Sequence, residues 1–329
     1  MDTNRICLIC PYFGKFPNYI DLTFRSCKSN PTIDWLLFTD CSNYSFLPDN
    51  VKIIRTSFDD FRKRIQAAFD FPIALNKPYK LCDFKPTYGD ILEEYLQGYD
   101  FWGHCDLDVI FGDLRNFCTD EILSKYDKVF TRGHLTLYRN TPAVNRYFML
   151  PGDGYDYRDV FSDPHNKLFD EMNGVNKILA KHGIAQYQSE GLVADISTKM
   201  KKFVLGSPII NERLKNYPKQ IFFWENGKTF RAYHIKKKQI VTTEIAYIHF
   251  QKRKFPEPAF KVEDSLDAFY ITPDGFFEKI KKIQKYDFVA YNKGNFWGIL
   301  PYYNKLVIKK IKNRLNRFRH TIINSKDRD

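Results

Sequence analysis

Short hydrophobic runs alternate with amphipathic segments along the first 110 residues of the chain. The apolar runs at 6–13, 34–40, 51–57 and 99–112 predict strands. Apolar residues at helical spacing predict helices up to Cys27, over 58–70 and over 86–97, where Pro86 falls in the first turn. This alternation is typical of βαβ units, so the sequence predicts an α/β fold with a mixed, mainly parallel sheet flanked by helices.

The second half of the chain has a different pattern. Asn226 and Gly227 lie between two runs rich in aromatic residues, which is a strong signal for a β-hairpin. The run at 245–251 predicts a further strand. Since no repeat or low-complexity linker separates the two halves, we expect a single domain over residues 1–287 and a distinct tail over residues 288–329.

Composition restricts the class of protein. The chain has 329 residues, of which 43% are hydrophobic and 27% charged, values typical of a globular protein. No apolar stretch is long enough to span a membrane, and the N-terminus lacks a signal peptide pattern, so a cytoplasmic protein is expected. The seven cysteines are scattered among apolar residues, which predicts reduced, buried thiols; for the closely spaced Cys7 and Cys10, core packing is favoured over redox chemistry or zinc binding.

The net charge of +12 is concentrated in the tail. Residues 288–326 contain no acidic residue and nine basic ones: Lys293, Lys305, Lys309, Lys310, Lys312, Arg314, Arg317, Arg319 and Lys326. Apolar residues recur there every three or four positions, which indicates a basic amphipathic helix. We expect the tail to bind an anionic membrane surface, and so to place the protein on the cytoplasmic face of the membrane. The alternative is a C-terminal helix docked on the domain. Nucleic acid is not expected as a partner, because no recognised RNA-binding motif accompanies the charge.

Asp106 and Asp108 form a D-x-D motif where the fourth predicted strand ends. Two carboxylates that flank one residue can both reach a divalent cation, and oxygen ligands of this kind suit Mg²⁺ or Mn²⁺ bound to substrate phosphates. The alternative is a solvated turn in which one acid caps a helix. An acidic pair at the end of a buried strand is costly without a partner, which favours the metal site.

Several segments in a fixed order resemble the GT-A-type nucleotide-sugar-dependent glycosyltransferases, particularly the bacterial enzymes of capsule, exopolysaccharide and lipopolysaccharide assembly. The resemblance covers most of residues 1–260, and five segments carry it: 77–92, the D-x-D run at 101–117, 133–141, 169–179 and 247–255. It implies a GT-A-like, Rossmann-like fold and transfer of a sugar from a nucleotide-sugar, assigned as UDP-linked, to a saccharide, which for such enzymes is a lipid-linked intermediate.

The resemblance also implies roles on the donor side. Asp106 and Asp108 would bind Mn²⁺ or Mg²⁺ on the donor diphosphate, with His249 as the third ligand; otherwise His249 is a half-buried strand histidine. Lys252 and Arg253 would neutralise the leaving diphosphate, or they form an ordinary basic turn. The nucleotide is expected to lie among residues near the strand ends and in the segment before the motif, namely Pro11, Tyr12, Phe13, Lys80, Asp83 and Lys85.

On the acceptor side, His134 and Thr136 match the segment that lines the sugar pocket, although both would also fit a solvent-facing strand. An inverting reaction needs a carboxylate that takes the proton of the attacking hydroxyl, and Glu171 or Asp170 is the best candidate. Both acids would equally suit the first turn of a helix, where the dipole favours negative charge.

Three other classes remain in view from the sequence. A haloacid-dehalogenase-like phosphatase also uses D-x-D, but there the motif follows the first strand and precedes a Gly-Thr pair, whereas Val109 and Ile110 follow it here. A sugar nucleotidyltransferase would need a Gly-rich loop after the first strand, and residues 11–18 form a poor one. A non-enzymatic peripheral membrane protein would explain the tail but not the D-x-D motif with His249.

Overall fold

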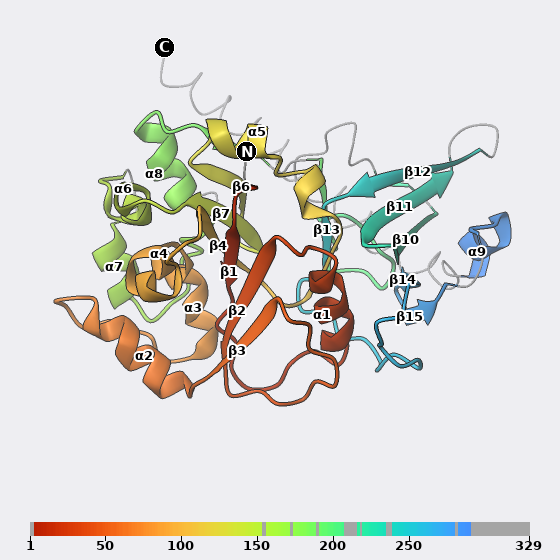
Figure 1. Cartoon of the computed structure of the whole chain (residues 1–329), viewed down its shortest axis with the longest axis horizontal. Coiled ribbons are helices and arrows are strands. Elements are labelled where there is room, and N and C mark those ends of the chain that lie inside the picture. The colour runs from red at the N-terminus through yellow and green to blue at the C-terminus, as the bar shows by residue number, and fades with distance from the viewer. Residues whose placement is uncertain are drawn as a thin grey trace, which may run out of the picture.

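A seven-stranded mixed sheet forms the centre of the molecule (Figure 1), in the strand order β3-β2-β1-β4-β7-β6-β8. The computed structural model describes residues 3–152, 156–171, 174–188, 191–206, 216–217, 219–234, 239–279 and 282–290. The strands are β1 (Ile6–Ile9), β2 (Ile33–Thr39), β3 (Val51–Arg55), β4 (Phe101–Cys105), β6 (Lys128–Arg132), β7 (Leu135–Arg139) and β8 (Gln186–Tyr187). Within this sheet β7 runs antiparallel to both neighbours, and the other adjacent pairs are parallel. This arrangement confirms the expected α/β fold.

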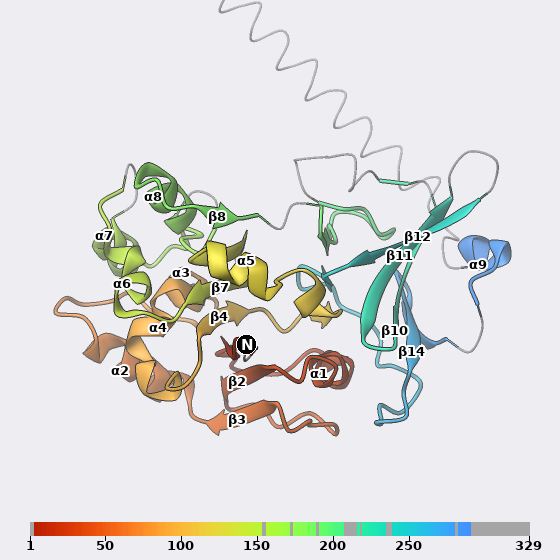
Figure 2. The same ribbon diagram turned by 45° about the horizontal axis from the view of Figure 1, so that its top comes forward.

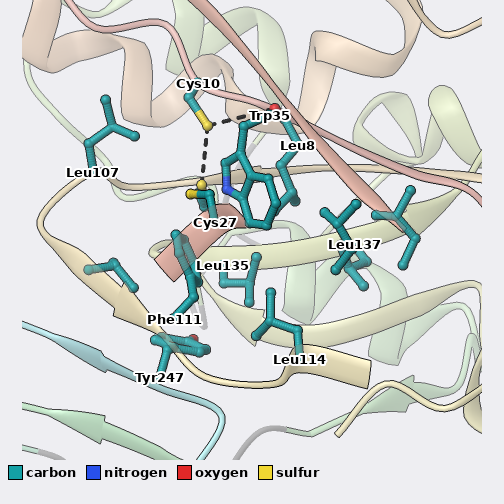
Figure 3. Close-up of a cluster of buried hydrophobic side chains, with 14 of the residues drawn as sticks. Leu8, Cys10, Cys27, Trp35, Leu107, Phe111, Leu114, Leu135, Leu137 and Tyr247 are labelled. Carbon is teal, nitrogen blue, oxygen red and sulfur yellow. Dashed lines mark hydrogen bonds between the residues drawn. The ribbon is translucent and has the colours of Figure 1, made fainter. Parts of the chain in front are cut away.

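Helices cover both faces of the sheet. They are α1 (Ile20–Lys28), α2 (Phe58–Ala67), α3 (Leu81–Phe84), α4 (Tyr88–Ile91), α5 (Asp120–Lys125), α6 (Pro142–Asn145), α7 (Tyr157–Ser162), α8 (Val175–Lys181) and α9 (Lys285–Ala290), the last of which lies away from this sheet. Successive side chains of β1 pack into hydrophobic cores on opposite faces of the sheet. Leu8 packs in the cluster that includes residues of α1 (Figure 3), whereas Cys7 and Ile9 pack in the cluster that includes residues of α2. Burial on both faces explains why these strands read as continuous apolar runs.

Local signals set the start of several helices. The Ser57 side chain accepts a hydrogen bond from the backbone N–H of Asp60 at the start of α2, and Thr119 caps α5 in the same way through Ile122. Acidic residues occupy the first turn of both helices, where they complement the helix dipole. The sequence therefore determines these two boundaries through ordinary N-capping.

The helix predicted over 86–97 is wrong as a continuous element. The segment folds instead as η2 (Lys85–Thr87), α4 and η3 (Glu93–Tyr95). Gly89 packs directly on Trp102, since a Cβ added to it would lie 2.3 Å from Cε2 of that ring. At Leu92, φ of −120° and ψ of 27° end α4. Packing against the sheet therefore overrides the helical spacing of the apolar residues.

Two smaller sheets complete the fold. The first has the order β5-β13-β9 and comprises β5 (Val109–Phe111), β13 (Tyr247–His249) and β9 (Val193–Asp195). The second is antiparallel, in the order β12-β11-β10-β14-β15, and comprises β10 (Gln220–Glu225), β11 (Lys228–His234), β12 (Ile240–Ile245), β14 (Ala268–Thr272) and β15 (Gly275–Glu278). Asn226 and Gly227 join β10 to β11 with φ of 49° and 80°, so the predicted hairpin is confirmed. The remaining 3-10 turns are η1 (Pro78–Lys80), η4 (Leu114–Asn116) and η5 (Tyr147–Met149).

The five-stranded sheet lies beside α1 (Figure 2) and packs on it through an aromatic core. Its outer side buries Phe288 of α9 completely, so the packed body includes a residue of the segment assigned to the tail, 288–329. The rest of that tail, residues 291–329, lies outside the described residues. Among the helices that are described, none has the length and apolar character required to cross a membrane.

Candidate functional site

A cavity of about 1030 Å³ opens where β1 and β4 end. The carboxyl ends of neighbouring parallel strands meet at one edge of a sheet, which is where ligands of such folds bind. The lining includes most of the residues singled out from the sequence: Pro11, Tyr12, Phe13, Lys85, Asp106, Asp108, Asp170, Glu171, His249, Lys252 and Arg253.

Asp106, Asp108 and His249 converge in this cavity. Each offers a ligand atom, and these atoms all lie within 4.8 Å of one another. His249 Nε2 is 3.7 Å from Asp106 Oδ2 and 3.5 Å from Asp108 Oδ1. His249 lies 141 residues after Asp108 in the sequence. The two meet because β13 pairs with β5, which directly follows the D-x-D motif. Two carboxylates with one imidazole form a donor set that suits Mn²⁺ and also accommodates Mg²⁺.

A second layer of contacts holds two of these side chains, His249 and Asp108. His249 Nδ1 is 2.8 Å from Asp195 Oδ1, and Gln251 Nε2 donates to Asp195 Oδ2 at 2.7 Å. The backbone N–H of Lys252 donates to Asp108 Oδ2. Gln251 and Lys252 both have positive φ, at 49° and 61°, which side-chain-bearing residues rarely adopt. The strained turn after β13 thus supports the histidine and one carboxylate together.

The charges of the cluster shift its pKa values in opposite directions. Burial alone would raise the pKa of Asp108, but the hydrogen bond and charge of His249 and the N–H of Lys252 lower it to about 2. Burial alone would lower the pKa of His249, whereas hydrogen bonds to Asp108 and Asp195 raise it to about 10. The acidic surroundings therefore favour a positive charge at this point of the cavity, as a bound cation would supply.

Lys85 joins the cluster to a second acidic pair. Its Nζ lies 2.7 Å from Asp106 Oδ1 and 3.3 Å from Asp170 Oδ2, and it donates to the carbonyl of Gly133 at 2.8 Å. Burial alone would lower the pKa of Lys85, but Asp106 and Asp170 raise it well above its usual range. The lysine is therefore positively charged and shared between the two groups of acids.

Asp170 and Glu171 lie in a turn before α8, so they are not helix-start residues; the helix begins at Val175 after Gly174. Burial raises the pKa of Asp170 to about 7. Its Oδ1 has no hydrogen-bond partner among the described residues. A Cβ added to Gly133 would lie 2.4 Å from Asp170 Oδ2, so any side chain at this position would displace the carboxylate. Burial also raises the pKa of Glu171, which is less buried than Asp170.

Two residues expected to bind the donor lie elsewhere. Lys80 and Asp83 are absent from the cavity lining and form a completely buried ion pair at 2.7 Å. Lys80 also donates to the carbonyls of Val160 and His165, so both side chains are occupied by structural contacts. This expectation is corrected: the pair fixes loops beside the cavity.

The acceptor-side expectation for His134 and Thr136 is corrected as well. Neither residue lines the cavity. Thr136 is fully buried and donates to the carbonyl of Arg132. His134 Nδ1 lies 2.7 Å from the Tyr247 hydroxyl, and its ring stacks on His249 with centroids 4.4 Å apart. His134 thus packs behind the candidate metal ligand.

The two basic residues after β13 differ. The Lys252 ammonium lies 3.3 Å from the centroid of the Tyr79 ring within the cavity. The Arg253 guanidinium donates to the carbonyls of Ser197, Met200 and Lys201. Both residues line the cavity, but the Arg253 side chain also anchors the loop after β9.

Sequence reasoning missed Asp195, Gln251, Tyr79 and Leu168, which contact or line this site. Asp195 ends a short apolar run, a weak local signal. It reaches His249 because β9 pairs in parallel with β13, with Asp195 directly opposite His249. That register joins residues 54 positions apart, and no local pattern predicts it.

Comparisons with known proteins place the chain in a family but do not establish an activity. One similar solved structure is the galactosyltransferase LgtC in complex with donor and acceptor sugar analogs, at 12% identity and a TM-score of 0.33, covering 57% of this chain and 75% of that one. Another is an active-site mutant of LgtC, at 11% identity and a TM-score of 0.35, covering 75% and 88%. Similarity at this level carries no argument about chemistry. No curated protein matches the sequence. A family profile described as "Family of unknown function (DUF6625)" matches residues 8–280, most of the chain, and the protein therefore belongs to that family.

Proposed function

We propose that this protein is a metal-dependent glycosyltransferase that moves a sugar from a nucleotide-sugar, UDP-linked, to a saccharide acceptor. The observation that carries the proposal is the convergence of Asp106, Asp108 and His249, supported by Asp195, in a cavity at the carboxyl ends of parallel strands. Lys15, Lys252 and Lys254 also line the cavity, and their charge complements a diphosphate. The capsule, exopolysaccharide or lipopolysaccharide role implied by the sequence resemblance belongs to this proposal.

The residues of the site take distinct roles in the proposed reaction. Asp106, Asp108 and His249 Nε2 would hold Mn²⁺ or Mg²⁺, which as a Lewis acid stabilises the leaving diphosphate. Lys252 adds positive charge near the same oxygens. Pro11, Tyr12 and Phe13 follow β1 and offer the base a partly aromatic wall.

If the reaction inverts the anomeric centre, Glu171 takes the proton of the acceptor hydroxyl. Glu171 is only partly buried, so it is more open to a substrate than Asp170, and its raised pKa makes the carboxylate a stronger base. Asp170 holds Lys85 between the two acidic groups. A retaining reaction needs no such base, and the Glu171→Gln variant distinguishes the two courses by losing transfer only in the inverting case.

The first experiment is a thermal-shift and hydrolysis screen of UDP-, GDP- and CMP-sugars with and without Mn²⁺. Wild type is compared with Asp108→Asn, and with Asp264→Asn as a control for an exposed carboxylate outside the site. We expect one nucleotide class to stabilise wild type and the control in the presence of metal, and to lose this effect in Asp108→Asn. No nucleotide-dependent shift in folded wild type contradicts the proposal, and hydrolysis of p-nitrophenyl phosphate in its place would favour the phosphatase class.

The proposed location is the cytoplasmic face of a membrane, where a lipid-linked acceptor is presented. The support is the concentration of basic residues between 288 and 326. Flotation with vesicles containing anionic lipid tests it, by comparing the full chain with a version ending at Ala290, which keeps the buried Phe288. Equal flotation of the two versions contradicts this location for the tail.

A further inference from the structure

Two large hydrophobic side chains are exposed at the rim of the cavity. Tyr79 is 52% exposed and Leu168 is 46% exposed, and both line the cavity. The other exposed large hydrophobic residues of the described chain, none of which lines the cavity, are Leu47, Met149, Phe277 and Val289. Exposed apolar side chains that gather at a cavity indicate a ligand surface, whereas single ones on the surface need no explanation.

The backbone holds Leu168 in an unfavourable conformation. Its φ is +55°, in the left-handed region that favours glycine. Core packing does not account for the strain, because the side chain is among the most exposed hydrophobic ones of the described chain. Strain of this kind persists where surrounding contacts impose it, and it concentrates at ligand-binding positions.

The surrounding contacts are those of the buried Lys80–Asp83 pair. Asp83 accepts hydrogen bonds from the backbone N–H groups of Lys167 and Phe169, at 3.0 to 3.2 Å, on either side of Leu168. Asn166 Nδ2 donates to the carbonyl of Tyr79 at 3.0 Å. Because Tyr79 directly precedes Lys80, the same contacts hold the backbone at Tyr79 close to the backbone around Leu168.

The chemistry beside Leu168 is acidic, whereas the Tyr79 ring carries the Lys252 ammonium on one face, 3.3 Å from its centroid. Leu168 precedes Asp170 and Glu171 by two and three residues, and all three line the cavity. A pyranose carries an apolar C–H face and an edge of hydroxyl groups. Its face suits an aromatic ring with an adjacent aliphatic side chain, and its hydroxyls suit carboxylates. The anionic diphosphate of a donor is disfavoured next to Asp170 and Glu171 by charge repulsion.

We infer that Tyr79 and Leu168 form the binding surface for the saccharide acceptor. The inference rests on the proposed transferase function and names a subsite that His134 and Thr136, both away from the cavity, do not provide. The acceptor lies with one apolar face against this pair, and its attacking hydroxyl points toward Glu171. The Lys80–Asp83 pair positions the surface without contacting the sugar.

The test is saccharide binding to the full chain by saturation-transfer NMR, with UDP and Mg²⁺ present. The probes are lactose, maltose, cellobiose and N-acetylglucosamine. The variants are Tyr79→Ala and Leu168→Gly. Leu47→Ala is the control because Leu47 is 44% exposed, close to the value for Leu168, but lies outside the cavity. We expect at least one probe to bind wild type and Leu47→Ala with equal affinity. The same probe should bind Tyr79→Ala and Leu168→Gly roughly tenfold more weakly.

Leu168→Gly carries a second readout. Glycine relieves the strain at positive φ, so the thermal midpoint of this variant should equal or exceed that of wild type while saccharide affinity falls. A loss of binding with retained stability therefore cannot be attributed to unfolding.

Two results overturn the inference. One is equal affinity of wild type and both rim variants for every probe that binds. The other is a wild-type protein that responds to a nucleotide and metal but binds none of the saccharides. Absence of the nucleotide response itself instead contradicts the proposed function, so the two failures are distinguishable.

Discussion

His249 Nδ1 lies 2.8 Å from Asp195 Oδ1, and this contact determines which ring nitrogen faces the D-x-D carboxylates. The two residues are opposite each other on parallel strands β13 and β9. With Nδ1 engaged, Nε2 is directed to Asp106 and Asp108. Carboxylates in this position orient metal-binding histidines and increase their affinity for the ion.

Asp195→Asn should therefore weaken metal binding. Asparagine keeps the shape but removes the negative charge, so the Kd for Mn²⁺ is expected to rise about 10- to 100-fold. Electron paramagnetic resonance of free Mn²⁺ during a titration of the full chain measures this change, with Asp264→Asn as the control.

An unchanged Kd would show that Asp195 does not support the ligand. The stoichiometry is informative too, because His134, Asp195 and His249 form a second group whose ligand atoms lie within 4.8 Å. One ion per chain agrees with Asp195 as a supporting residue; two ions, with one lost in Asp195→Asn, would make it a direct ligand.

Loss of the Lys80 ammonium should lower the free energy of unfolding substantially. Lys80→Ala leaves the fully buried Asp83 without its cation, and removal of one partner of a buried pair costs about 3 to 5 kcal/mol of unfolding free energy. Urea denaturation measures it. Lys28→Ala breaks an exposed pair with Asp264 and is expected to cost under about 1 kcal/mol. Similar values for the two variants would contradict the structural role of Lys80.

The first strands of the central sheet could be predicted from the sequence because their signals are local. The apolar runs at 6–13 and 51–57 contain β1 and β3, the run at 34–40 covers all of β2 except Ile33, and Asn226 with Gly227 forms the expected hairpin. The segment over 86–97 failed because its backbone is shaped by contact with Trp102 in another element. Period and turn residues therefore predict elements well where tertiary packing agrees with them.

The site was predictable only in part, because tertiary packing decides which of its side chains face the cavity. Asp106 and Asp108 form a motif that can be recognised at the end of a predicted strand, and His249 lies in another predicted strand. Lys80 and Asp83 have the residue types of a ligand-binding pair, but their burial, which the sequence does not reveal, makes them structural. Tyr79 and Leu168 give no signal in sequence, because exposure and positive φ are properties of the folded chain.

Stability should fall as pH rises through the range in which unfolded Asp170 loses its proton and folded Asp170 keeps it. Burial raises the folded pKa to about 7, against 3.8 for the ordinary group. Between these values the folded state binds more protons than the unfolded state. The free energy of unfolding therefore decreases by roughly a few kcal/mol from pH 4 to pH 7, and it changes little at higher pH.

Urea denaturation at pH 5 and pH 8 tests this pH dependence, with Asp170→Asn compared to wild type. The charged and titratable groups around Asp170 are Lys85, Asp106, Glu171, Lys128, Cys82 and Tyr138, and they remain in the variant. The difference between the two proteins therefore isolates the carboxyl group. If the difference in unfolding free energy is the same at both pH values, Asp170 titrates normally.

Gly133→Ala should damage the site more than the fold. The added Cβ would lie 2.4 Å from Asp170 Oδ2 and 3.1 Å from Glu171 Oε1, so both carboxylates must move, and Lys85 loses its present geometry. Gly152→Ala is the matched control, since its Cβ would lie 2.6 Å from Ile178 Cγ1, away from the cavity. Overpacking costs each variant about 1 to 3 kcal/mol of unfolding free energy. We expect sugar transfer to fall at least tenfold further in Gly133→Ala than in Gly152→Ala when both are assayed well below their melting temperatures. Equal transfer by the two variants would mean that the positions of Asp170 and Glu171 do not matter for the reaction.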